Sequence, residues 1–372
     1  MRIGIDVHAA ERDGSGNCTY VRGLLQALLS QDFENEYILY AIDKKHRFYR
    51  DIRLDAKVRL RPLPVENPLI RIPLFLGRAT YRDALDILHV QFIAPPWHKG
   101  RLVATIHDLS FLHVPETFTR FFVFRSRMFI RQTARRAAKI ITGSQFSKED
   151  ISTRYSLLPE KIEVIPYGVS PRFSEAQSLE RIQKTLAKYQ IRQPYILSVG
   201  RMNPRKNLVS LSSAFSRLKS EMNLTHQLVL AGKDDYETAR TIASIKNAGG
   251  RGVVLTGFVD EDDLPALYQG ADIFVYPSLF EGVGLPALEA MAAGVPVIAS
   301  NSSSLPEMIG DAGIVIDPLS VNEIAEALRR LVSDKNLKEE CRRKGQKRAA
   351  EFSWENAARK TLRIYQGLFS GS

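Results

Sequence analysis

The chain has 372 residues, 44% of them hydrophobic, and its 52 Lys and Arg against 41 Asp and Glu give a net charge of +11, which favours anionic partners. No stretch approaches the roughly 20 apolar residues that span a bilayer, and the length suffices for two ordinary domains. Because Cys18 and Cys341 lie in opposite halves, a disulfide framework or a structural zinc site is implausible, and a reducing cytoplasm is the natural compartment.

Apolar strands alternate with helical patterns from the first residues onward. Residues 1–7 read as a first strand rather than a signal peptide, because Asp6 interrupts the apolar run and no cleavage-like site follows. The alternation predicts parallel sheets with right-handed crossovers. In the first half we expect strands near residues 3–7, 37–42, 58–63, 87–90, 102–106, 140–143 and 162–165.

Chemistry-bearing residues follow two of these strands. Gly14 and Gly16 lie between the first strand and the first helix, where a phosphate can approach, although a glycine-rich turn alone is weak support. His107 follows the strand at 102–106 and is expected at the sheet edge, facing a cleft. An isolated histidine at such a position can equally satisfy a backbone carbonyl.

Residues 118–139, FTRFFVFRSRMFIRQTARRAAK, interleave cations with large apolar side chains. A basic, aromatic helix of this kind can lie on an anionic membrane surface. It can also dock its apolar side on the domain core and leave its arginines in water, which we favour because a strand follows at once. Nucleic-acid binding is the weakest alternative, since no nucleic-acid motif accompanies the charge.

The second half repeats the strand and helix alternation. It is preceded by the polar residues 170–193, which we expect to form a linker that contains a short helix. Two Rossmann-like domains are therefore predicted, with the second-half strands near residues 195–199, 227–231, 253–256, 273–276, 297–299 and 313–316.

The strand at 195–199 opens into the loop Gly200-Arg201-Met202-Asn203-Pro204-Arg205-Lys206-Asn207 and then into a helix. Arg201 and Lys206 would stand at the carboxyl edge of a parallel sheet, where ligands bind in open α/β folds. Two fixed cations at that edge can neutralise a diphosphate. Taken alone, the loop is better explained as a solvated basic turn, and the second strand–loop–helix site in the same half reverses that preference.

The strand at 273–276 leads to Glu281-Gly282-Val283-Gly284-Leu285-Pro286-Ala287-Leu288-Glu289, where Pro286 suits a first helical turn. Such a helix start offers unpaired N–H groups to an anion. Glycine at 282 and 284 lets the backbone approach a ligand, and the two glutamates can each accept hydrogen bonds from hydroxyl pairs. The alternative is an ordinary turn with solvated or helix-capping glutamates.

These motifs together resemble the retaining glycosyltransferases of family four, which have the two-domain GT-B fold. The resemblance spans nearly the whole chain and is most specific in the C-terminal half. One departure lies after Gly16, where Cys18 and Thr19 replace a frequent glycine and arginine, so the acceptor contacts there are in doubt. The motifs that carry the resemblance to the family are Gly14-Ser15-Gly16, His107-Asp108, the loop from Gly200 to Asn207, Gly257-Phe258-Val259-Asp260, and the Glu281 to Glu289 unit with the following Ala290-Met291-Ala292-Ala293-Gly294-Val295-Pro296.

The resemblance implies an acceptor-side domain at residues 1–169, the linker at 170–193, a nucleotide-sugar domain at 194–351, and a last helix at 352–372 that crosses back. It implies that Glu281 contacts the donor sugar, that Glu289 holds the ribose, and that Val259 lies in the loop that meets the base. The catalytic candidates are His107, Arg201, Lys206 and Glu281. The donor-binding candidates are Gly14, Gly16, Gly200, Val259, Gly282, Val283, Gly284, Leu285 and Glu289.

Asp260-Glu261-Asp262 formally matches an Asp-x-Asp metal motif. We expect no metal there, because the acidic run directly precedes a helical segment, where carboxylates favour the helix N-terminus. Arg201 and Lys206 are available to hold the diphosphate instead.

The resulting hypothesis is a retaining, metal-independent transferase that moves a hexose from a nucleotide sugar to a glycan or lipid-linked glycan. GDP-mannose is the preferred donor, from similarity to bacterial mannosyltransferases of polysaccharide assembly. UDP-glucose and UDP-N-acetylglucosamine remain open, and no cofactor or nucleic acid is expected. The alternatives are a sugar-nucleotide epimerase and a basic membrane- or nucleic-acid-binding protein with a vestigial transferase fold. The expected location is cytoplasmic, with peripheral contact to a membrane left open.

Overall fold

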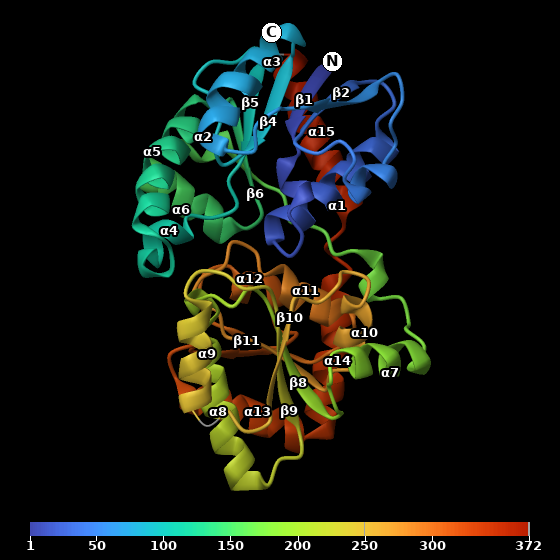
Figure 1. Ribbon diagram of the computed structural model, residues 1–372, viewed down its shortest axis with the longest axis vertical. Helices are drawn as coiled ribbons and strands as arrows, with labels where there is room; N and C mark the ends of the chain where they lie inside the picture. Colours follow the sequence, from blue (N-terminus) through green and yellow to red (C-terminus); the bar gives the residue numbers. More distant parts are fainter. Residues whose placement is uncertain (249, 371–372) are drawn as a thin grey trace. The chain divides into compact units, whose positions relative to one another are not determined.

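The computed structural model describes residues 1–248 and 250–370, which fold into two compact units (Figure 1). Unit 1 comprises Met1–Leu112, Arg120–Gly168 and the C-terminal segment from Ser353. Unit 2 comprises His113–Thr119 and Val169–Phe352. The chain therefore enters unit 2 briefly at residue 113, enters it again at residue 169, and ends in unit 1.

Unit 1 is built on a seven-stranded parallel sheet with the order β3-β2-β1-β4-β5-β6-β7. The order reverses between β1 and β4, as in doubly wound folds. Its strands are β1 (Arg2–Asp6), β2 (Glu36–Ala41), β3 (Val58–Pro62), β4 (Ile87–Gln91), β5 (Arg101–Thr105), β6 (Lys139–Thr142) and β7 (Ile162–Val164).

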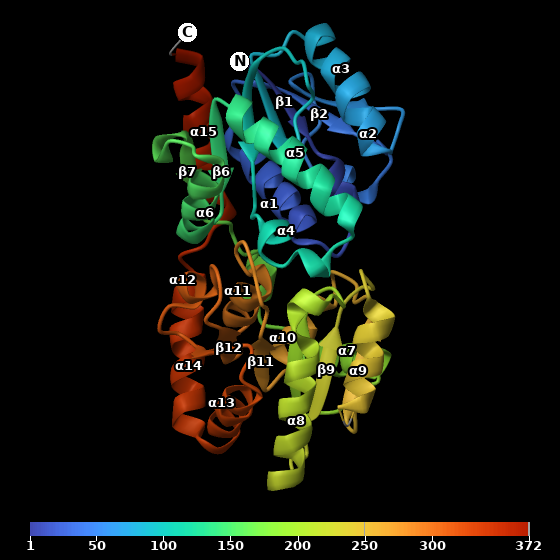
Figure 2. The ribbon, with the colours of Figure 1, turned by 90° about the vertical axis from the view of Figure 1, so that its left-hand side faces the viewer.

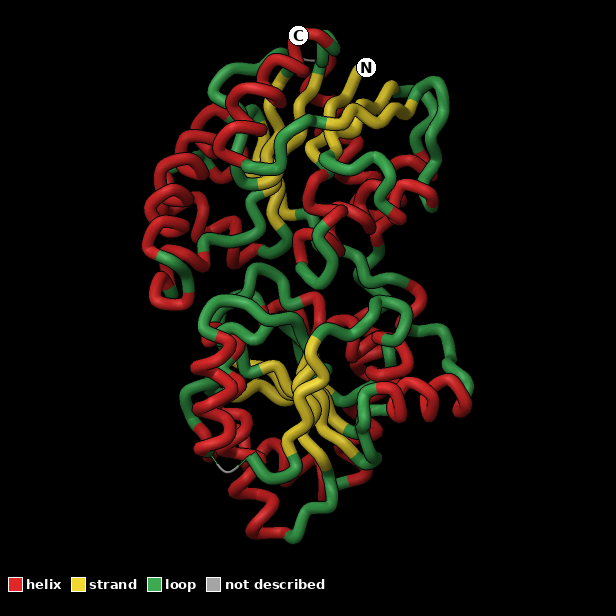
Figure 3. The backbone as a smooth tube through the Cα atoms, viewed as in Figure 1, coloured by secondary structure: helices red, strands yellow, loops and turns green. Residues whose placement is uncertain are grey.

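The strands of unit 1 are buried because helices cover the sheet, as parallel sheets require. In Figure 3 the strands lie among helices in both units. Helix α1 packs against α15, the last helix of the chain. The α-helices that belong wholly to unit 1 are α1 (Gly16–Gln31), α2 (Pro68–Ile70), α3 (Gly77–Arg82), α5 (Arg120–Arg136), α6 (Gln145–Tyr155) and α15 (Trp354–Ser370), while α4 (Ser110–His113) ends at the first residue of unit 2.

Two glycines allow α15 to dock on unit 1. A Cβ atom at Gly23 of α1 would lie 2.2 Å from the Trp354 ring, and one at Gly168 would lie 2.2 Å from the Trp354 amide nitrogen. Ser353 begins the helix by accepting the Asn356 N–H at 3.1 Å. Farther along α15, the buried Tyr365 hydroxyl lies 2.5 Å from Nδ1 of His89. The C-terminal helix is therefore an integral part of the unit 1 core.

Unit 2 is built on a six-stranded parallel sheet with the order β10-β9-β8-β11-β12-β13. Its strands are β8 (Tyr195–Val199), β9 (Gln227–Ala231), β10 (Val253–Gly257), β11 (Ile273–Tyr276), β12 (Val297–Ser300) and β13 (Ile314–Ile316). Its helices are α7 (Leu179–Lys188), α8 (Leu208–Met222), α9 (Thr238–Asn247), α10 (Leu264–Gln269), α11 (Leu285–Ala292), α12 (Leu305–Ile309), α13 (Val321–Ser333) and α14 (Lys335–Ala349).

The core of unit 2 joins the sheet to α8 and α13, through side chains such as Phe215, Leu228 and Leu328 that are fully buried. All strands predicted in both units are present, and no predicted end differs from the observed one by more than one residue. The predicted α/β architecture of two Rossmann-like domains is confirmed. It follows from runs of β-branched and aliphatic residues that are buried on both faces of a parallel sheet.

Residues 170–193 differ from the expectation of a linker, because they belong to unit 2. Within them, α7 packs against α10, and Lys188 at its end bonds to Asp260 at 2.6 Å and Asp263 at 2.7 Å. The polar composition reflects a helix with one exposed face rather than a tether. Only Ile182, Thr185 and Leu186 of α7 are buried, which is too few for a strong sequence signal.

Helix α5, within the basic stretch 118–139, differs partly from the expectation that its apolar side docks on the core. The residues of α5 that are buried carry small or aliphatic side chains: Val123, Ser126, Ile130, Thr133 and Ala134. Phe121 and Phe124, in contrast, are 63% and 66% exposed. Over residues 1–248 and 250–370, no helix combines the length and apolar character needed to cross a membrane.

Candidate active site

The candidate residues of unit 2 lie where its strand order reverses. Strands β8 and β11 are neighbours at this point, and each opens into a loop at its carboxyl end. Ligands of open α/β sheets bind in the crevice outside such a switch point. The loop after β8 carries Gly200, Arg201 and Lys206, and the loop after β11 carries Glu281 and Gly284.

Lys206 and Glu281, one from each loop, are directly bonded. Nζ of Lys206 donates to Oε1 of Glu281 at 2.6 Å and to the hydroxyl of Tyr276 at 2.5 Å. Both charged side chains are only 10% exposed. The sequence interpretation gave the two residues separate ligand roles, whereas the structure joins them in one ion pair.

Arg205 is a second cation on the same carboxylate. Its Nη1 atom lies 3.0 Å from Oε1 of Glu281 and also donates to the carbonyl of Phe280. The short helical turn Pro204–Lys206 presents both cations, and Asn203 caps this turn by accepting the Arg205 N–H at 2.9 Å. Sequence reasoning missed Arg205, because adjacency to Lys206 does not show that both side chains point the same way.

This cluster sets the ionisation of Glu281. Burial favours its neutral form, but the charges of Arg205 and Lys206 outweigh burial and hold the pKa of Glu281 at about 2. The carboxylate is therefore ionised at every physiological pH. Two cations against one anion leave the cluster with a net positive charge, which suits an anionic ligand.

The backbone of the Glu281 loop is fixed from both sides. The Glu281 N–H donates to Ser303 Oγ at 2.8 Å, and the Ser304 hydroxyl donates to the Glu281 carbonyl at 3.0 Å. Gly284 has φ +89°, and a Cβ there would lie 2.4 Å from Leu305, so only glycine fits. Gly282, Val283 and Leu285 are buried around it. At the start of α11, Pro286 has no N–H, and the Ala287 N–H donates to the Gly284 carbonyl at 3.0 Å.

Glu289 lies inside α11 and is 9% exposed. Its Oε2 atom accepts the Tyr268 hydroxyl at 2.9 Å. Burial raises the pKa of Glu289 above its ordinary value, while the Tyr268 bond and the charge of Arg172 partly oppose that rise. The pKa values of the two glutamates are thus shifted in opposite directions. Cations hold Glu281 ionised, whereas Glu289 is buried and accepts a hydrogen bond from the neutral Tyr268 hydroxyl.

The remaining candidates of unit 2 lie outside the cluster formed by Lys206, Arg205 and Glu281. Nη1 of Arg201 lies 3.7 Å from Asp235, and its side chain is 39% exposed. Val259 is 5% exposed just after β10. Asp260, from the formal metal motif, pairs with Lys188 at 2.6 Å.

In unit 1, His107 follows β5 and is 6% exposed. Its Nδ1 atom lies 2.5 Å from the Tyr167 hydroxyl and its Nε2 atom 3.3 Å from Oε1 of Gln91. Burial, aided by His89, lowers the pKa of His107 to about 3, so the ring is neutral. The neighbouring Phe92 adopts φ +57°, a strained conformation for a bulky residue.

The two candidate glycines of unit 1 precede or begin α1. Gly14 has φ +76°, Gly16 is the first residue of the helix, and both are exposed. Between them, Ser15 caps the helix by accepting the Cys18 N–H at 3.2 Å. These positions fit a helix N-terminus that is accessible to a ligand.

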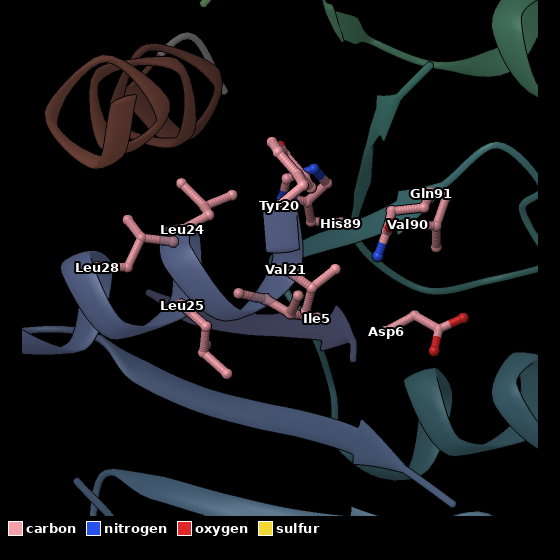
Figure 4. Close-up of a pocket in the computed structure, with 10 residues that line it drawn as sticks. All are labelled: Ile5, Asp6, Tyr20, Val21, Leu24, Leu25, Leu28, His89, Val90 and Gln91. Atoms are coloured by element: carbon pink, nitrogen blue, oxygen red, sulfur yellow. The ribbon is translucent and has the colours of Figure 1, made fainter. Parts of the chain in front are cut away.

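A pocket of unit 1 lies between α1, β1 and β4 (Figure 4). Aliphatic side chains such as Leu24 and Leu28 line most of it, with Tyr20 and His89 beside them. The carboxylate of Asp6 points away from these aliphatic groups (Figure 4). The pocket offers few polar groups to orient a sugar, so we attribute it to packing beneath α1.

Known proteins resemble this chain along both halves of its sequence. Residues 15–173 match the family model "Glycosyltransferase Family 4", and residues 182–348 match "Glycosyl transferases group 1". O-antigen chain mannosyltransferase B of Escherichia coli is 34% identical over 84% of this chain and 83% of its own length. The chain belongs to the family-four glycosyltransferases.

A second relative of this family-four glycosyltransferase is also a mannosyltransferase by name. The serotype-specific mannosyltransferase WbdA of E. coli is 32% identical over 74% of this chain, which spans only 34% of that longer protein. Two solved structures share the fold from end to end. Sucrose-phosphate synthase of Thermosynechococcus elongatus has a TM-score of 0.80 at 22% identity, covering 100% of this chain and 99% of its own. Anabaena HepE in complex with UDP-glucose has a TM-score of 0.73 at 16% identity, covering 98% and 99%.

A glycosyltransferase that uses a nucleotide-sugar donor needs groups that stabilise the departing nucleoside diphosphate. Lys206 and Arg205 supply two fixed positive charges in a largely buried setting, where electrostatic interactions are stronger than in water. The buried Glu289 supplies hydrogen-bond acceptance for hydroxyl groups. The arrangement in unit 2 is therefore chemically suited to a nucleotide-sugar donor.

Proposed function

We propose that this enzyme transfers mannose from GDP-mannose to a glycan or lipid-linked glycan during polysaccharide assembly, with retention of configuration and without a metal ion. The mannose assignment is supported by O-antigen chain mannosyltransferase B, the relative that matches over most of both chains. A mannosyltransferase of Mycolicibacterium hassiacum, 30% identical over 63% of this chain, adds to it.

The observation that carries the proposal is the junction of Lys206, Arg205 and Glu281 at the switch point. When the donor breaks its anomeric bond, negative charge grows on the diphosphate and positive charge grows on the sugar. Lys206 and Arg205 would stabilise the first, with Arg201 nearby in sequence as a third cation. This positive charge is the reason that we propose transfer without a metal.

Glu281 would bind the donor sugar by giving up part of its contact with Lys206 and Arg205. When phosphate oxygens engage Lys206 and Arg205, the carboxylate becomes available to hydroxyl groups of the hexose. Glu289, whose second oxygen is not used by Tyr268, would accept from the ribose. His107, neutral at physiological pH, would act as a hydrogen-bonding group rather than as a charge.

Retention is proposed from family membership. In such a reaction the bond from the sugar C1 to the phosphate oxygen breaks, and the acceptor oxygen bonds to C1 on the same face. The acceptor hydroxyl loses its proton to a donor phosphate oxygen, and the nucleoside diphosphate leaves. The chain then needs to supply cations and hydrogen-bonding groups, but no carboxylate as base.

The test is a donor screen on the purified protein. GDP-mannose, UDP-glucose and UDP-N-acetylglucosamine are compared for thermal stabilisation and slow hydrolysis, with and without EDTA, because a ligand of the native state raises its stability. GDP-mannose should give the largest response, unchanged by EDTA. A preference for a UDP sugar overturns the donor, loss with EDTA overturns metal independence, and no response to any sugar favours the vestigial-transferase alternative. The anomeric configuration of the product, read by NMR, tests retention.

A further inference from the structure

One flank of unit 1 is both basic and apolar on its surface. We define the basic flank as residues 67–82, 93–101 and 120–136. All three segments contain Lys or Arg, and none contains Asp or Glu. Figures 1 and 2 both show α2, α3 and α5, which these segments include, along the same flank of unit 1.

Helix α5 contributes a mixed exposed face. Phe121, Phe124 and Met128 are 63%, 66% and 49% exposed and succeed one another at intervals of three and four residues, so they share one side of the helix. Arginines border this apolar row. The exposed ones are Arg120, Arg127, Arg131, Arg135 and Arg136.

Residues 67–82 and 93–101 also expose both apolar and cationic side chains. Leu69, Ile70 and Leu74 are each more than 40% exposed, and Tyr81 and Trp97 are 55% and 53% exposed. The cations Arg78, Arg82 and Lys99 are exposed among them. Large apolar side chains are thus presented to solvent together with positive charge over three separate segments of unit 1.

Specific contacts join the segments into one surface. The Ala94 N–H donates to Thr133 Oγ1 of α5 at 2.9 Å, and Arg136 donates to the Pro95 carbonyl at 2.8 Å. Two residues later, Trp97 lies against Gly77 of α3, where a Cβ would be 3.0 Å from the Trp97 carbonyl oxygen. The loop at 93–101 therefore bridges α5 and α3.

We propose that the basic flank binds the surface of a membrane that contains anionic lipids. Exposed aromatic and aliphatic side chains would enter the headgroup region while arginines pair with lipid phosphates, which is how interfacial amphipathic helices bind. Aliphatic residues such as Leu69, Leu74 and Met128 favour a bilayer over a nucleic acid, because they neither stack on bases nor pair with phosphates. The inference goes beyond the proposed function and does not depend on the donor.

Trp97 provides a direct optical reporter. The chain has two tryptophans; Trp97 is 53% exposed, whereas Trp354 is 6% exposed. Mixing the full protein with vesicles of phosphatidylcholine and phosphatidylglycerol should shift the emission to shorter wavelength, and phosphatidylcholine alone should shift it little. The shift should be absent in Trp97→Phe, although that variant still binds in a flotation assay. Flotation without any shift in the wild type would exclude insertion of this flank.

Two double variants separate the charge from the apolar contribution. Arg127→Glu with Arg131→Glu should weaken vesicle binding by about tenfold or more, chiefly at low salt. Phe121→Ser with Phe124→Ser should weaken it comparably at high salt as well. The matched control is Arg240→Glu with Lys246→Glu on the exposed side of α9 in unit 2, which should bind as the wild type does.

Donor hydrolysis and thermal melting of each variant verify that the fold is intact. Equal binding by the wild type and both flank variants would overturn the proposal. So would loss of binding in the α9 control, which would indicate nonspecific attraction of the whole cationic protein. Tighter binding to a DNA duplex than to anionic vesicles, lost in the same flank variants, would favour a nucleic-acid surface instead.

Discussion

Nζ of Lys206 lies 2.6 Å from Oε1 of Glu281, with both side chains 10% exposed. These two residues come from loops after neighbouring strands of the unit 2 sheet, and each is a candidate for donor binding. Each side chain therefore already has a charged partner within the cluster. Donor binding would then be an exchange of partners, in which phosphate oxygens replace the carboxylate on the cations.

The first prediction concerns Lys206. Lys206→Met should lower kcat/KM for donor hydrolysis and transfer by about 100- to 1,000-fold, because one preorganised charge is removed from the leaving group. Lys246→Met, at an exposed position of α9, is the matched control and should retain full activity. Steady-state kinetics with the preferred donor provides the measurement. An unimpaired Lys206→Met enzyme would place the diphosphate elsewhere.

The second prediction is the acid sensitivity of the Glu281 cluster. A carboxyl whose folded-state pKa is about 2 against an ordinary value of 4.5 contributes stability above pH 4.5 and loses it as the pH falls towards 2. Glu281→Gln should thus be less stable than the wild type at pH 7, and the difference should shrink between pH 5 and pH 3. Urea unfolding at several pH values measures this, and a difference that stays constant with pH would contradict it.

The third prediction is a trade-off at Glu289. Because burial raises the pKa of this carboxyl, its charge at pH 7 opposes folding. Glu289→Gln keeps an acceptor for Tyr268 and should stabilise the free enzyme by about 1 kcal/mol, while donor affinity falls. Glu326→Gln on α13, 57% exposed, should change neither property. Melting curves with and without donor separate the two effects, and a destabilised Glu289→Gln enzyme that binds donor normally would refute the role.

The fourth prediction tests the docking of the last helix. Gly→Ala inside a helix normally stabilises by about 1 kcal/mol, but a Cβ at Gly23 would lie 2.2 Å from the Trp354 ring. Gly23→Ala should therefore destabilise the protein. At Gly367 a Cβ would have no described atom within 4 Å apart from its chain neighbours and the backbone of its own helix, so Gly367→Ala should follow the normal rule and stabilise the protein. The opposite signs are read from thermal unfolding, and the same sign in both would argue against this packing.

The fifth prediction concerns His107. Because burial and then His89 hold its pKa at about 3, the imidazole should stay neutral from pH 5 to pH 8. Its NMR ring resonances should then be constant over that range, whereas an ordinary histidine titrates near 6.5. His107→Gln should reduce transfer without changing the shape of the pH profile above pH 5. A resonance that titrates near neutrality would disprove the neutral assignment.

Residue type and order were enough to predict the two parallel sheets, because buried strands are continuous apolar runs, and glycine and proline mark where those runs end. The sequence also indicated the strand–loop–helix connections that contain Lys206 and Glu281. Glycine and proline mark the loops, and the charged residues within them can be read directly from the sequence. The tertiary structure alone decided that Arg205 shares the carboxylate of Glu281, that residues 170–193 belong to unit 2, and that Phe121 and Phe124 face solvent. These features depend on which side of a turn or helix meets the rest of the chain. That side is fixed by packing between segments distant in sequence, which local patterns do not specify.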